Sequence, residues 1–550
     1  MKRIAVLTLV LALALSPPSL AAEGTEYSDV AGEDWFAPYV EVCGREGLME
    51  GTGEGRFEPE GIVSMDEALV MAGRVFWLAD GGTGALPKGG SVEEFISLVH
   101  ESHPLSDPPH EGQRKVYEEL SQSWAWDGIF YLTRRFREEL GGQSTIYYTR
   151  SGAAPREAFF SLLSVAGQGL ELEPLNEVEA LPDCEDPGIL TLYRAGILTG
   201  TDEFGSFSGA RTLTRSEAAA VLARLVRPEL RTAFSPAPLP TQGYTLTYLM
   251  DGVMGIGVDY PVCGWYAAEG QESGFVTLEG KQLPWPGVVP SFGLERDGEY
   301  VYFAAWNENT EDNPYDTKKG LMDRDGNYAI PMEDCDSLYS ANDGHFLRVE
   351  IADPLASPTR SRWFLLSADG TVEAELPETI GTPENNWRGF NEGVCPWKDE
   401  ESGLTGYVDR TGAWAVAPTW RSATSFYRGY AAVENADGLI GLIDRSGRLV
   451  LPYQYRELQH GHVSPGSDAP LLYQFADQDG RKGWIQPDGT EVSGPLASRY
   501  QNGYFTQSGI YYDLDGRPAS QKFDAAGPLN AEGAGFVELG EKIYRIQFHP

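Results

Sequence analysis

Residues 406–418 read GYVDRTGAWAVAP, and this stretch decides the fold of the C-terminal half of the chain. Two short apolar runs flank a polar turn that closes on Gly412, and Pro418 ends the second run. Runs of four or five such residues have the length of a strand rather than a helix. Thr411 precedes the turn glycine, as is typical of a hairpin whose last turn residue needs a positive φ. The stretch therefore predicts a β-hairpin.

The same hairpin pattern recurs along the second half of the chain. Four further copies also have two glycines six residues apart, and they begin at Gly274, Gly320, Gly441 and Gly483. With two looser copies, the turn glycines recur about every 40 residues, a period typical of stacked strand units that cannot bury their apolar face alone. Seven turns fit a propeller of about 4–8 blades. Because closure leaves only short edges, we favour an all-β, β-propeller-like domain, with a β-solenoid as the alternative.

These units resemble the WG repeat of bacterial surface and secreted proteins. The clearest copy is Lys482-Gly483-Trp484-Ile485 followed by Pro487-Asp488-Gly489. In other copies the tryptophan is shifted or replaced, as in Gly406-Tyr407 and Gly441-Leu442. The resemblance implies a WG-type β-repeat domain over residues 244–550. Its partner, a protein or a glycan, is not named by the sequence.

The start of the chain has the features of a secretory signal peptide over residues 1–22. Lys2 and Arg3 precede an apolar run from Ile4 to Leu15, and residues 19–22 offer small side chains for cleavage. The run is too short to span a membrane, and no other run approaches that length. We therefore expect a secreted protein with no transmembrane segment.

Composition narrows the remaining classes of function. The formal net charge of −39 disfavours nucleic acid and anionic membranes as partners. The five cysteines are scattered, and none are paired at metal-ligand spacing, so we interpret them as small buried residues. His100, His103 and His110 lie in a Pro-rich segment that indicates a surface loop rather than a metal site. No catalytic residue, cofactor or metal site is predicted.

Two stretches of the N-terminal third share a helix–loop–helix pattern. In the first, a helix from about Trp35 to Glu46 precedes a Gly-rich loop, and a second helix follows Ser64. Glu67 stands three residues after Ser64, which is the spacing of a capping box. Thr214 and Glu217 repeat this spacing in the second stretch.

These two stretches resemble the S-layer homology (SLH) domain. The motifs that carry the resemblance are Asp29-Val30, Trp35-Phe36, Gly47-Leu48-Met49-Glu50-Gly51 and Phe57-Glu58-Pro59 in the first stretch, and Gly196-Ile197-Leu198-Thr199-Gly200 and Leu213-Thr214-Arg215-Ser216-Glu217-Ala218 in the second. The family works as three repeats packed into an α-helical pseudo-trimer. A weak middle copy fits between the two stretches, with Trp126 to Leu140 as its first helix and Ala154 to Phe159 opening its second.

The resemblance implies a multidomain protein with a definite order of segments. We expect the signal peptide to be followed by SLH repeat 1 (23–77), an insertion (78–118), a degenerate SLH repeat 2 (119–172), SLH repeat 3 (173–230), a Pro-rich linker (231–243) and the β-repeat domain (244–550). Three prolines in five residues make the linker a semi-rigid extended spacer.

The family binds secondary cell-wall polysaccharide, often pyruvylated, without a covalent bond. A planar guanidinium pairs bidentately with a ketal carboxylate. The family's arginine corresponds to Arg215 here and to Arg156 in the middle copy, whereas the first copy has Met65. Asp29 and Trp35 match other signature positions and complete the expected polysaccharide-binding set. The alternatives are a solvated helix face for Arg215 and a core position for Trp35.

Two functions remain open from the sequence. The first is a non-enzymatic protein that anchors to the cell wall of a bacterium and displays the repeat domain for protein or glycan binding. The second is a wall-associated glycan hydrolase with its active site in the repeat domain. Carboxylates are so abundant that a glycosidase pair can be neither located nor dismissed. Since binding repeats need no such pair, we favour the first.

Overall fold

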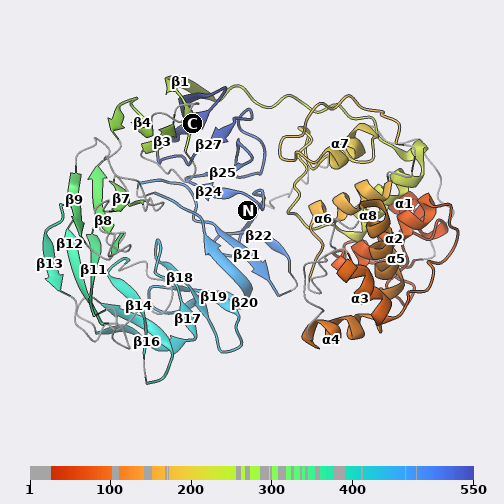
Figure 1. The fold of residues 1–550 in the computed structure, drawn as a ribbon, viewed down its shortest axis with the longest axis horizontal. Helices are drawn as coiled ribbons and strands as arrows, with labels where there is room; N and C mark the ends of the chain where they lie inside the picture. Colours follow the sequence, from red (N-terminus) through yellow and green to blue (C-terminus); the bar gives the residue numbers. More distant parts are fainter. Residues whose placement is uncertain are drawn as a thin grey trace, which may run out of the picture. The chain divides into compact units, whose positions relative to one another are not determined.

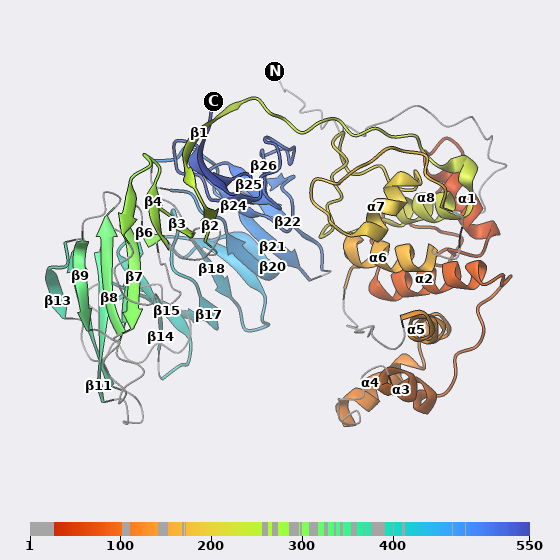
Figure 2. The ribbon, with the colours of Figure 1, turned by 45° about the horizontal axis from the view of Figure 1, so that its top comes forward.

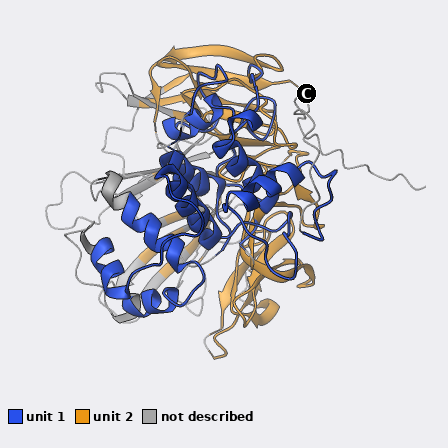
Figure 3. Ribbon diagram, turned by 90° about the vertical axis from the view of Figure 1, so that its right-hand side faces the viewer, with its two compact units in different colours: residues 1–238, 479–481 blue, residues 239–478, 482–550 orange. Residues whose placement is uncertain are grey.

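The computed structural model describes residues 27–101, 111–140, 152–255 without 168, 169 and 171, strand segments between 262 and 375, and 391–549 without 400, 410–412, 465 and 479. The chain forms two compact units, residues 1–238 with 479–481, and residues 239–478 with 482–550 (Figure 3). The signal peptide predicted at 1–22 lies outside the described residues. In the described part, no helix is long and apolar enough to cross a membrane.

The first unit is helical. Its elements are α1 (Ala37–Arg45), α2 (Met65–Ala79), α3 (Val92–Glu101), α4 (Glu111–Leu120), α5 (Trp126–Leu140), α6 (Arg156–Ala166), α7 (Pro187–Arg194), α8 (Arg215–Val226) and the short 3-10 helix η2 (Pro228–Leu230) (Figure 1). The pairs α1/α2, α5/α6 and α7/α8 are the helices of repeats 1, 2 and 3. One continuous hydrophobic core runs through all three repeats.

Short backbone bridges join the three repeats where their second helices begin. The bridges pair Ile62 with Thr214, Ser64 with Ala153, and Pro155 with Thr212. Each repeat therefore pairs with both of the others, as a three-fold arrangement requires. The predicted α-helical pseudo-trimer is confirmed.

Local signals placed the starts of the second helices correctly. The side chain of Ser64 accepts from the backbone N–H of Glu67, and Glu67 caps Ser64 in return. Thr214 and Glu217 form the same reciprocal box at the start of α8. Each box satisfies backbone donors that a helix N-terminus otherwise leaves unpaired.

The insertion between repeats 1 and 2 contains the helices α3 and α4. Phe95 of α3 packs on Trp126 and Phe130 of α5, with ring centroids 5.0 and 6.1 Å apart. Figure 2 shows α3 and α4 beside α5 at the edge of the helical unit. The loop predicted around His100 is wrong at that residue, because α3 extends through Glu101. The other two histidines of that segment lie outside the described residues.

The second unit is built from antiparallel strands. Its first sheets are β2 (Val253–Met254), β3 (Val262–Tyr266), β4 (Ser273–Thr277) and β5 (Gln282–Pro284); β6 (Arg296–Asp297), β7 (Tyr300–Trp306), β8 (Thr317–Asp323) and β9 (Tyr328–Asp334); and β10 (Ser337–Ser340), β11 (His345–Asp353), β12 (Arg360–Ser367) and β13 (Val372–Glu375). A three-stranded sheet follows, with β14 (Val394–Lys398), β15 (Thr405–Asp409) and β16 (Trp414–Trp420).

The remaining strands complete the unit. They are β17 (Ser422–Ala423), β18 (Tyr430–Glu434), β19 (Ile440–Asp444), β20 (Leu449–His460), β21 (Tyr473–Asp477), β22 (Lys482–Ile485) and β23 (Glu491–Val492) in one sheet; β24 (Arg499–Gln501), β25 (Tyr504–Gln507) and β26 (Ile510–Tyr512) in the next; and β27 (Ala525–Ala526), β28 (Ala534–Glu538) and β29 (Lys542–Phe548) with β1 (Tyr244–Asp251) in the last.

Successive sheets follow one another around a ring (Figure 1). The long strand β20 pairs with β19 up to Tyr455 and with β21 from Tyr455 onward, so it ends one blade and begins the next. Counted this way, the described strands form eight blades. The turn glycines seen in the sequence mark the first seven blades.

The eighth blade joins strands from opposite ends of the unit. β1 pairs with β29 in antiparallel register, from Tyr244 opposite Phe548 to Asp251 opposite Lys542. β28 and β27 continue this sheet on the other side of β29. The pairing closes the array, so the β-propeller-like prediction is confirmed over the solenoid.

Polar side chains also link neighbouring blades through tight turns. Glu392, Arg428 and Asn502 each precede a glycine and have positive φ angles of 55°, 50° and 48°. Glu392 accepts from the backbone N–H of Gly429 at 2.9 Å, and Asn502 donates to the carbonyl of Leu529 at 2.7 Å. Both bonds cross from one blade to another. The turns therefore hold neighbouring blades together as well as reversing the chain.

Candidate functional site

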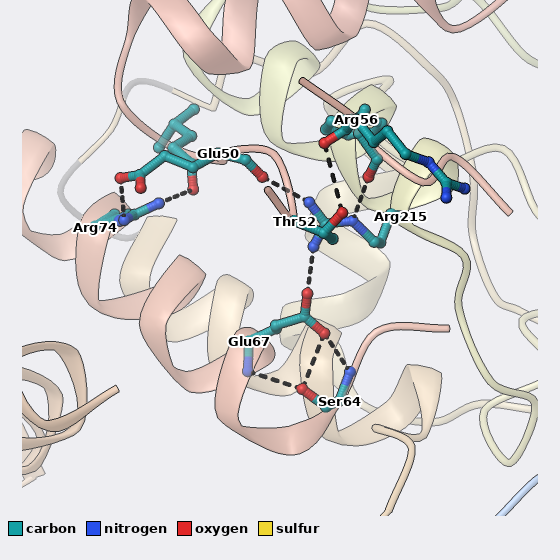
Figure 4. Close-up of polar contacts among 9 residues, drawn as sticks. Glu50, Thr52, Arg56, Ser64, Glu67, Arg74 and Arg215 are labelled. Atoms are coloured by element: carbon teal, nitrogen blue, oxygen red, sulfur yellow. Dashed lines mark hydrogen bonds and ion pairs between the residues drawn. The ribbon is translucent and has the colours of Figure 1, made fainter. Parts of the chain in front are cut away.

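Arg215 is the first residue of α8 and reaches from repeat 3 into repeat 1 (Figure 4). Its Nε donates to the carbonyl of Phe57 at 2.8 Å, and its Nη2 donates to the carbonyl of Glu50 at 2.6 Å. Its Nη1 is bound to the Glu67 carboxylate. The guanidinium carbon lies 4.9 Å from the Phe57 ring centroid. With a side chain only 6% exposed, Arg215 clamps two repeats together and does not lie on a solvated face.

Arg156 occupies the equivalent position at the start of α6 and reaches from repeat 2 into repeat 3. Its Nε donates to the carbonyl of Phe207 at 3.0 Å. The guanidinium carbon lies 5.0 Å from the ring centroid of Phe160 and 5.6 Å from that of Phe207. Burial lowers the pKa of Arg156. Within the described residues, Phe207 alone accepts a hydrogen bond from Arg156, and no carboxylate forms an ion pair with it.

An aspartate braces the loop that each arginine contacts. Asp29 accepts from the backbone N–H groups of Phe57 and Glu58, both at 2.8 Å. In repeat 3, Asp183 makes the same two bonds at 2.7 and 2.8 Å. Asp29 thus acts on the candidate site through the loop, because it orients the carbonyl of Phe57 toward Arg215.

The pKa values of Asp29 and Asp183, which brace the two loops, are shifted in opposite directions. Burial opposes ionisation of Asp29, but the N–H groups of Phe57 and Glu58 outweigh it and hold its pKa below the ordinary value. Burial is the larger effect at Asp183 and raises its pKa, although the same kind of backbone bonds favour its ionised form. The nearby charge of Asp202 adds to that increase. The carboxylate of Asp183 is therefore more strongly desolvated than that of Asp29.

Trp35 lies on the surface rather than in the core, with 45% of its area exposed. Its ring meets Phe36 and Tyr39 edge-on, at centroid distances of 5.5 and 6.3 Å. Trp124 stands at the same place, two residues before the first helix of repeat 2, and is 66% exposed. The structure does not bring Trp35 into contact with either arginine. It offers two exposed indole faces at equivalent points of repeats 1 and 2.

Sequence reasoning missed several groups around the arginines. Glu67 was identified as a helix cap, yet its carboxylate also binds Arg215. Arg211 donates from Nη2 to Glu217 at 2.6 Å. The hydroxyls of Tyr193 and Ser206 are buried with no hydrogen-bond partner. The bond between Glu67 and Arg215 has no local signal because it depends on how the repeats pack, whereas Arg211 and Glu217 are only six residues apart in the sequence.

The architecture defines a modular repeat protein, with three helical repeats followed by a closed ring of β-repeats. Comparison with known families then names both modules. The S-layer homology domain matches residues 26–69, and the WG containing repeat matches residues 406–438. SLH domains bind cell-wall polysaccharide, and the match indicates association with a bacterial cell surface or cell wall.

Three solved structures show distant likenesses to this chain. The computationally designed Ika8 protein is 10% identical and covers 56% of this chain and 98% of its own, with a TM-score of 0.30. BamB from Moraxella catarrhalis is 12% identical, with coverages of 56% and 100% and a TM-score of 0.27. The β-propeller domain of the Trilobed protease from Pyrococcus furiosus is 11% identical, with coverages of 47% and 91% and a TM-score of 0.32. No curated protein matches the chain. The pairing of β1 with β29 defines the closed ring independently of these likenesses.

Proposed function

We propose that this chain is a secreted, non-enzymatic surface protein that anchors without a covalent bond to secondary cell-wall polysaccharide. The SLH unit binds the polymer, and the WG-repeat unit is displayed for protein or glycan binding. The observation that carries this proposal is Arg156, a buried guanidinium with one hydrogen-bond acceptor among the described residues.

The chemistry of a buried guanidinium favours an anionic ligand. Burying a cation costs free energy unless a charge or hydrogen bonds compensate for it. The faces of Phe160 and Phe207 stabilise the cation but accept none of its hydrogen bonds in the plane. A carboxylate such as that of ketal-linked pyruvate matches the guanidinium fork bidentately. A pyruvylated wall polymer supplies that group.

The net charge of the protein determines how this binding should depend on salt. A chain of net charge −39 repels an anionic polymer at long range. Recognition then depends on local cations, and moderate salt, which screens the long-range repulsion, should strengthen binding. Binding through many surface cations would instead weaken steadily as salt is added.

For the displayed unit, an open pocket of about 420 Å³ is a candidate contact point. Its lining includes Arg428, Tyr430, Arg445 and Arg448. Arg448 pairs with Asp444 and Arg445 pairs with Glu392, whereas Arg428 donates only to a backbone carbonyl at 3.3 Å. In an acidic chain, this pocket supports an acidic glycan or an acidic protein segment as the partner.

Cosedimentation with purified cell-wall sacculi tests the anchoring. We would compare the full chain without residues 1–22 on intact sacculi and on sacculi stripped of their secondary polymer. We expect binding only to intact sacculi, and at least about tenfold weaker binding for Arg156→Gln, because a charge-assisted bidentate contact is lost. Arg114→Gln, at an exposed arginine of α4, is the matched control and should bind as the wild type does. Equal binding to stripped sacculi would contradict the proposal.

A further inference from the structure

The two equivalent arginines are in different states because their neighbouring glutamates are paired differently. Glu67 and Glu217 hold the same place in the capping boxes of α2 and α8. The carboxylate of Glu67 binds Arg215. Glu217 faces the pocket of Arg156 from the same position, but its Oε1 is bound to Nη2 of Arg211 at 2.6 Å. One pocket thus has an internal carboxylate, and the other does not.

A single position explains the different pairing. Arg211 precedes the first residue of α8 by four positions, and Gly61 is its counterpart four positions before Met65 in α2. A Cβ at Gly61 would lie 3.0 Å from the carbonyl oxygen of Glu58 and 3.3 Å from Cδ of Arg215. A side chain at position 61 would be crowded, and Gly61 itself offers no guanidinium to compete for Glu67, which pairs with Arg215 instead.

The other polar groups near Arg156 do not replace the missing carboxylate. Asp183 influences the pKa of Arg156, but backbone N–H groups at 2.7 and 2.8 Å engage its two oxygens. Burial raises the pKa of Tyr193, so its hydroxyl stays protonated, and this hydroxyl is fully buried without a hydrogen-bond partner. Ser206, next to the carbonyl that Arg156 contacts, has a second such hydroxyl. Arg156, Tyr193 and Ser206 therefore each have at least one hydrogen-bond donor without an acceptor among the described residues in this part of repeat 3.

We propose that Arg211 is a positioning residue that holds Glu217 away from Arg156 and so keeps this pocket open to a ligand carboxylate. Glu67 fills the equivalent pocket of Arg215 from within the protein, and Met65 offers no guanidinium at the third position. This inference rests on the proposed function and narrows it. The SLH unit has one open carboxylate-binding pocket, between repeats 2 and 3, rather than two or three.

Calorimetric titration of the full chain tests the role of Arg211. The probe is soluble wall polysaccharide that carries ketal-linked pyruvate, and the control is the same polymer after mild acid has removed the pyruvate. We expect Arg211→Ala to bind at least about tenfold more weakly, because Glu217 can then turn onto Arg156. The double variant Arg211→Ala/Glu217→Gln should restore binding to within about threefold, because glutamine keeps the cap but carries no charge.

This rescue separates positioning from simple destabilisation. A variant that only loosens the fold is not repaired by a second substitution that removes a charge. Wild-type affinity in Arg211→Ala, or no recovery in the double variant, would overturn the inference while leaving polymer binding by the wild type intact.

A second measurement does not depend on the polymer. The Nε–Hε resonances of the arginines, assigned by substitution, would be followed by NMR while pyruvate is added as the carboxylate probe. We expect the Arg156 signal to shift and the Arg215 signal to stay. If the wild type binds no sacculi but Arg156 still shifts, the proposed function fails and the open pocket stands. A shift at Arg215 alone, or at neither residue, overturns the inference.

Discussion

The helical unit and the β unit hold their repeats together by different means. In the helical unit, three short backbone bridges and a buried arginine join repeats at a centre. In the β unit, the strand β20 is shared by two blades, hydrogen bonds such as that from Asn502 to the carbonyl of Leu529 cross between others, and the pairing of β1 with β29 completes the ring. The first arrangement leaves polar groups inside the interfaces. The second leaves mostly apolar ones, such as Tyr511, Phe523 and Ile546.

This difference explains why the helical unit has candidate ligand sites at its internal interfaces. A guanidinium in an interface needs a carbonyl or carboxylate partner, and the partner can come from the protein or from a ligand. An apolar interface between blades needs no polar partner once its side chains are packed. Stability in the β unit should thus depend on volume, and in the helical unit on charge pairing.

The largest expected effect is at the closure of the β unit. Ile546 is fully buried on β29, opposite Leu246 of β1 and Gly535 of β28. Ile546→Ala should cost about 4 kcal/mol, because the cavity opens where the two ends of the ring meet. Hydrogen exchange in urea would report the β unit separately from the helical unit. Leu539→Ala, at an exposed site, is the control, and an equal loss in both variants would contradict the closure as drawn.

The next-largest loss of stability is expected from breaking the ion pair of Arg215 and Glu67 in the helical unit. Arg215→Met leaves Glu67 without its partner and should destabilise the helical unit by about 3 kcal/mol. Arg156→Met removes a guanidinium that has no carboxylate and should cost about 1 kcal/mol, the size of one ordinary hydrogen bond. Equal costs, measured by the same exchange experiment, would show that the two pockets do not differ.

Within the β unit, the repeated turn glycines should not be equivalent. A Cβ at Gly516 would lie 1.9 Å from the carbonyl oxygen of Ser493, whereas at Gly447 the nearest atom, on Val416, is 3.5 Å away. Both residues have positive φ angles, 76° and 80°. Gly516→Ala should cost about 2 kcal/mol or more, and Gly447→Ala about 1 kcal/mol, since only the first adds a clash to the strain. Thermal unfolding of both variants makes the comparison, and similar melting temperatures would rule it out.

The smallest expected effect is the pH dependence of stability at Asp29 and Asp183, and its sign differs between the two residues. The lowered pKa of Asp29 means that its contribution is present above the unfolded value of 3.8 and is lost as pH falls through the folded pKa. The raised pKa of Asp183 means that the folded state binds the proton more tightly, so acid favours folding at this site. Between about pH 6 and 2, the stability difference from Asp29→Asn should shrink. As the pH falls over the same range, the free energy of unfolding of the wild type should rise relative to that of Asp183→Asn. Urea titrations at several pH values measure both slopes, and parallel slopes would refute the assignment.

Local features of the fold were predictable from the sequence because their causes are local. The capping boxes at Ser64 and Thr214 place two helix starts, and a helix from Trp126 to Leu140 agrees with α5. The turn glycines likewise mark one hairpin in each of the first seven blades. Each of these signals depends on residues a few positions apart, so propensity and spacing are enough to find them.

Features that depend on distant contacts were not predictable. The helix α3 in the insertion does begin with a local signal, because Ser91 and Glu94 cap each other, but it is held in place by the distant packing of Phe95 on α5. The eighth blade requires strands from both ends of the β unit. The motif placed Arg215 and Arg156 at equivalent positions, but the choice of Glu217 between Arg211 and Arg156 is made only in the packed interface. Motif equivalence therefore predicts location, and packing decides whether a site is open.

The pairing of Tyr244 with Phe548 also sets an order of events during synthesis. The strand β1 leaves the ribosome long before β29, so its edge has no partner while the other blades are made. Contacts between such distant residues form slowly, because a long loop must close before the pairing is rewarded. Until then β1 presents unpaired backbone groups to any other chain, which is a route to aggregation or strand exchange. The same strand that completes the ring is thus the point at which a nascent chain is most exposed to misassembly.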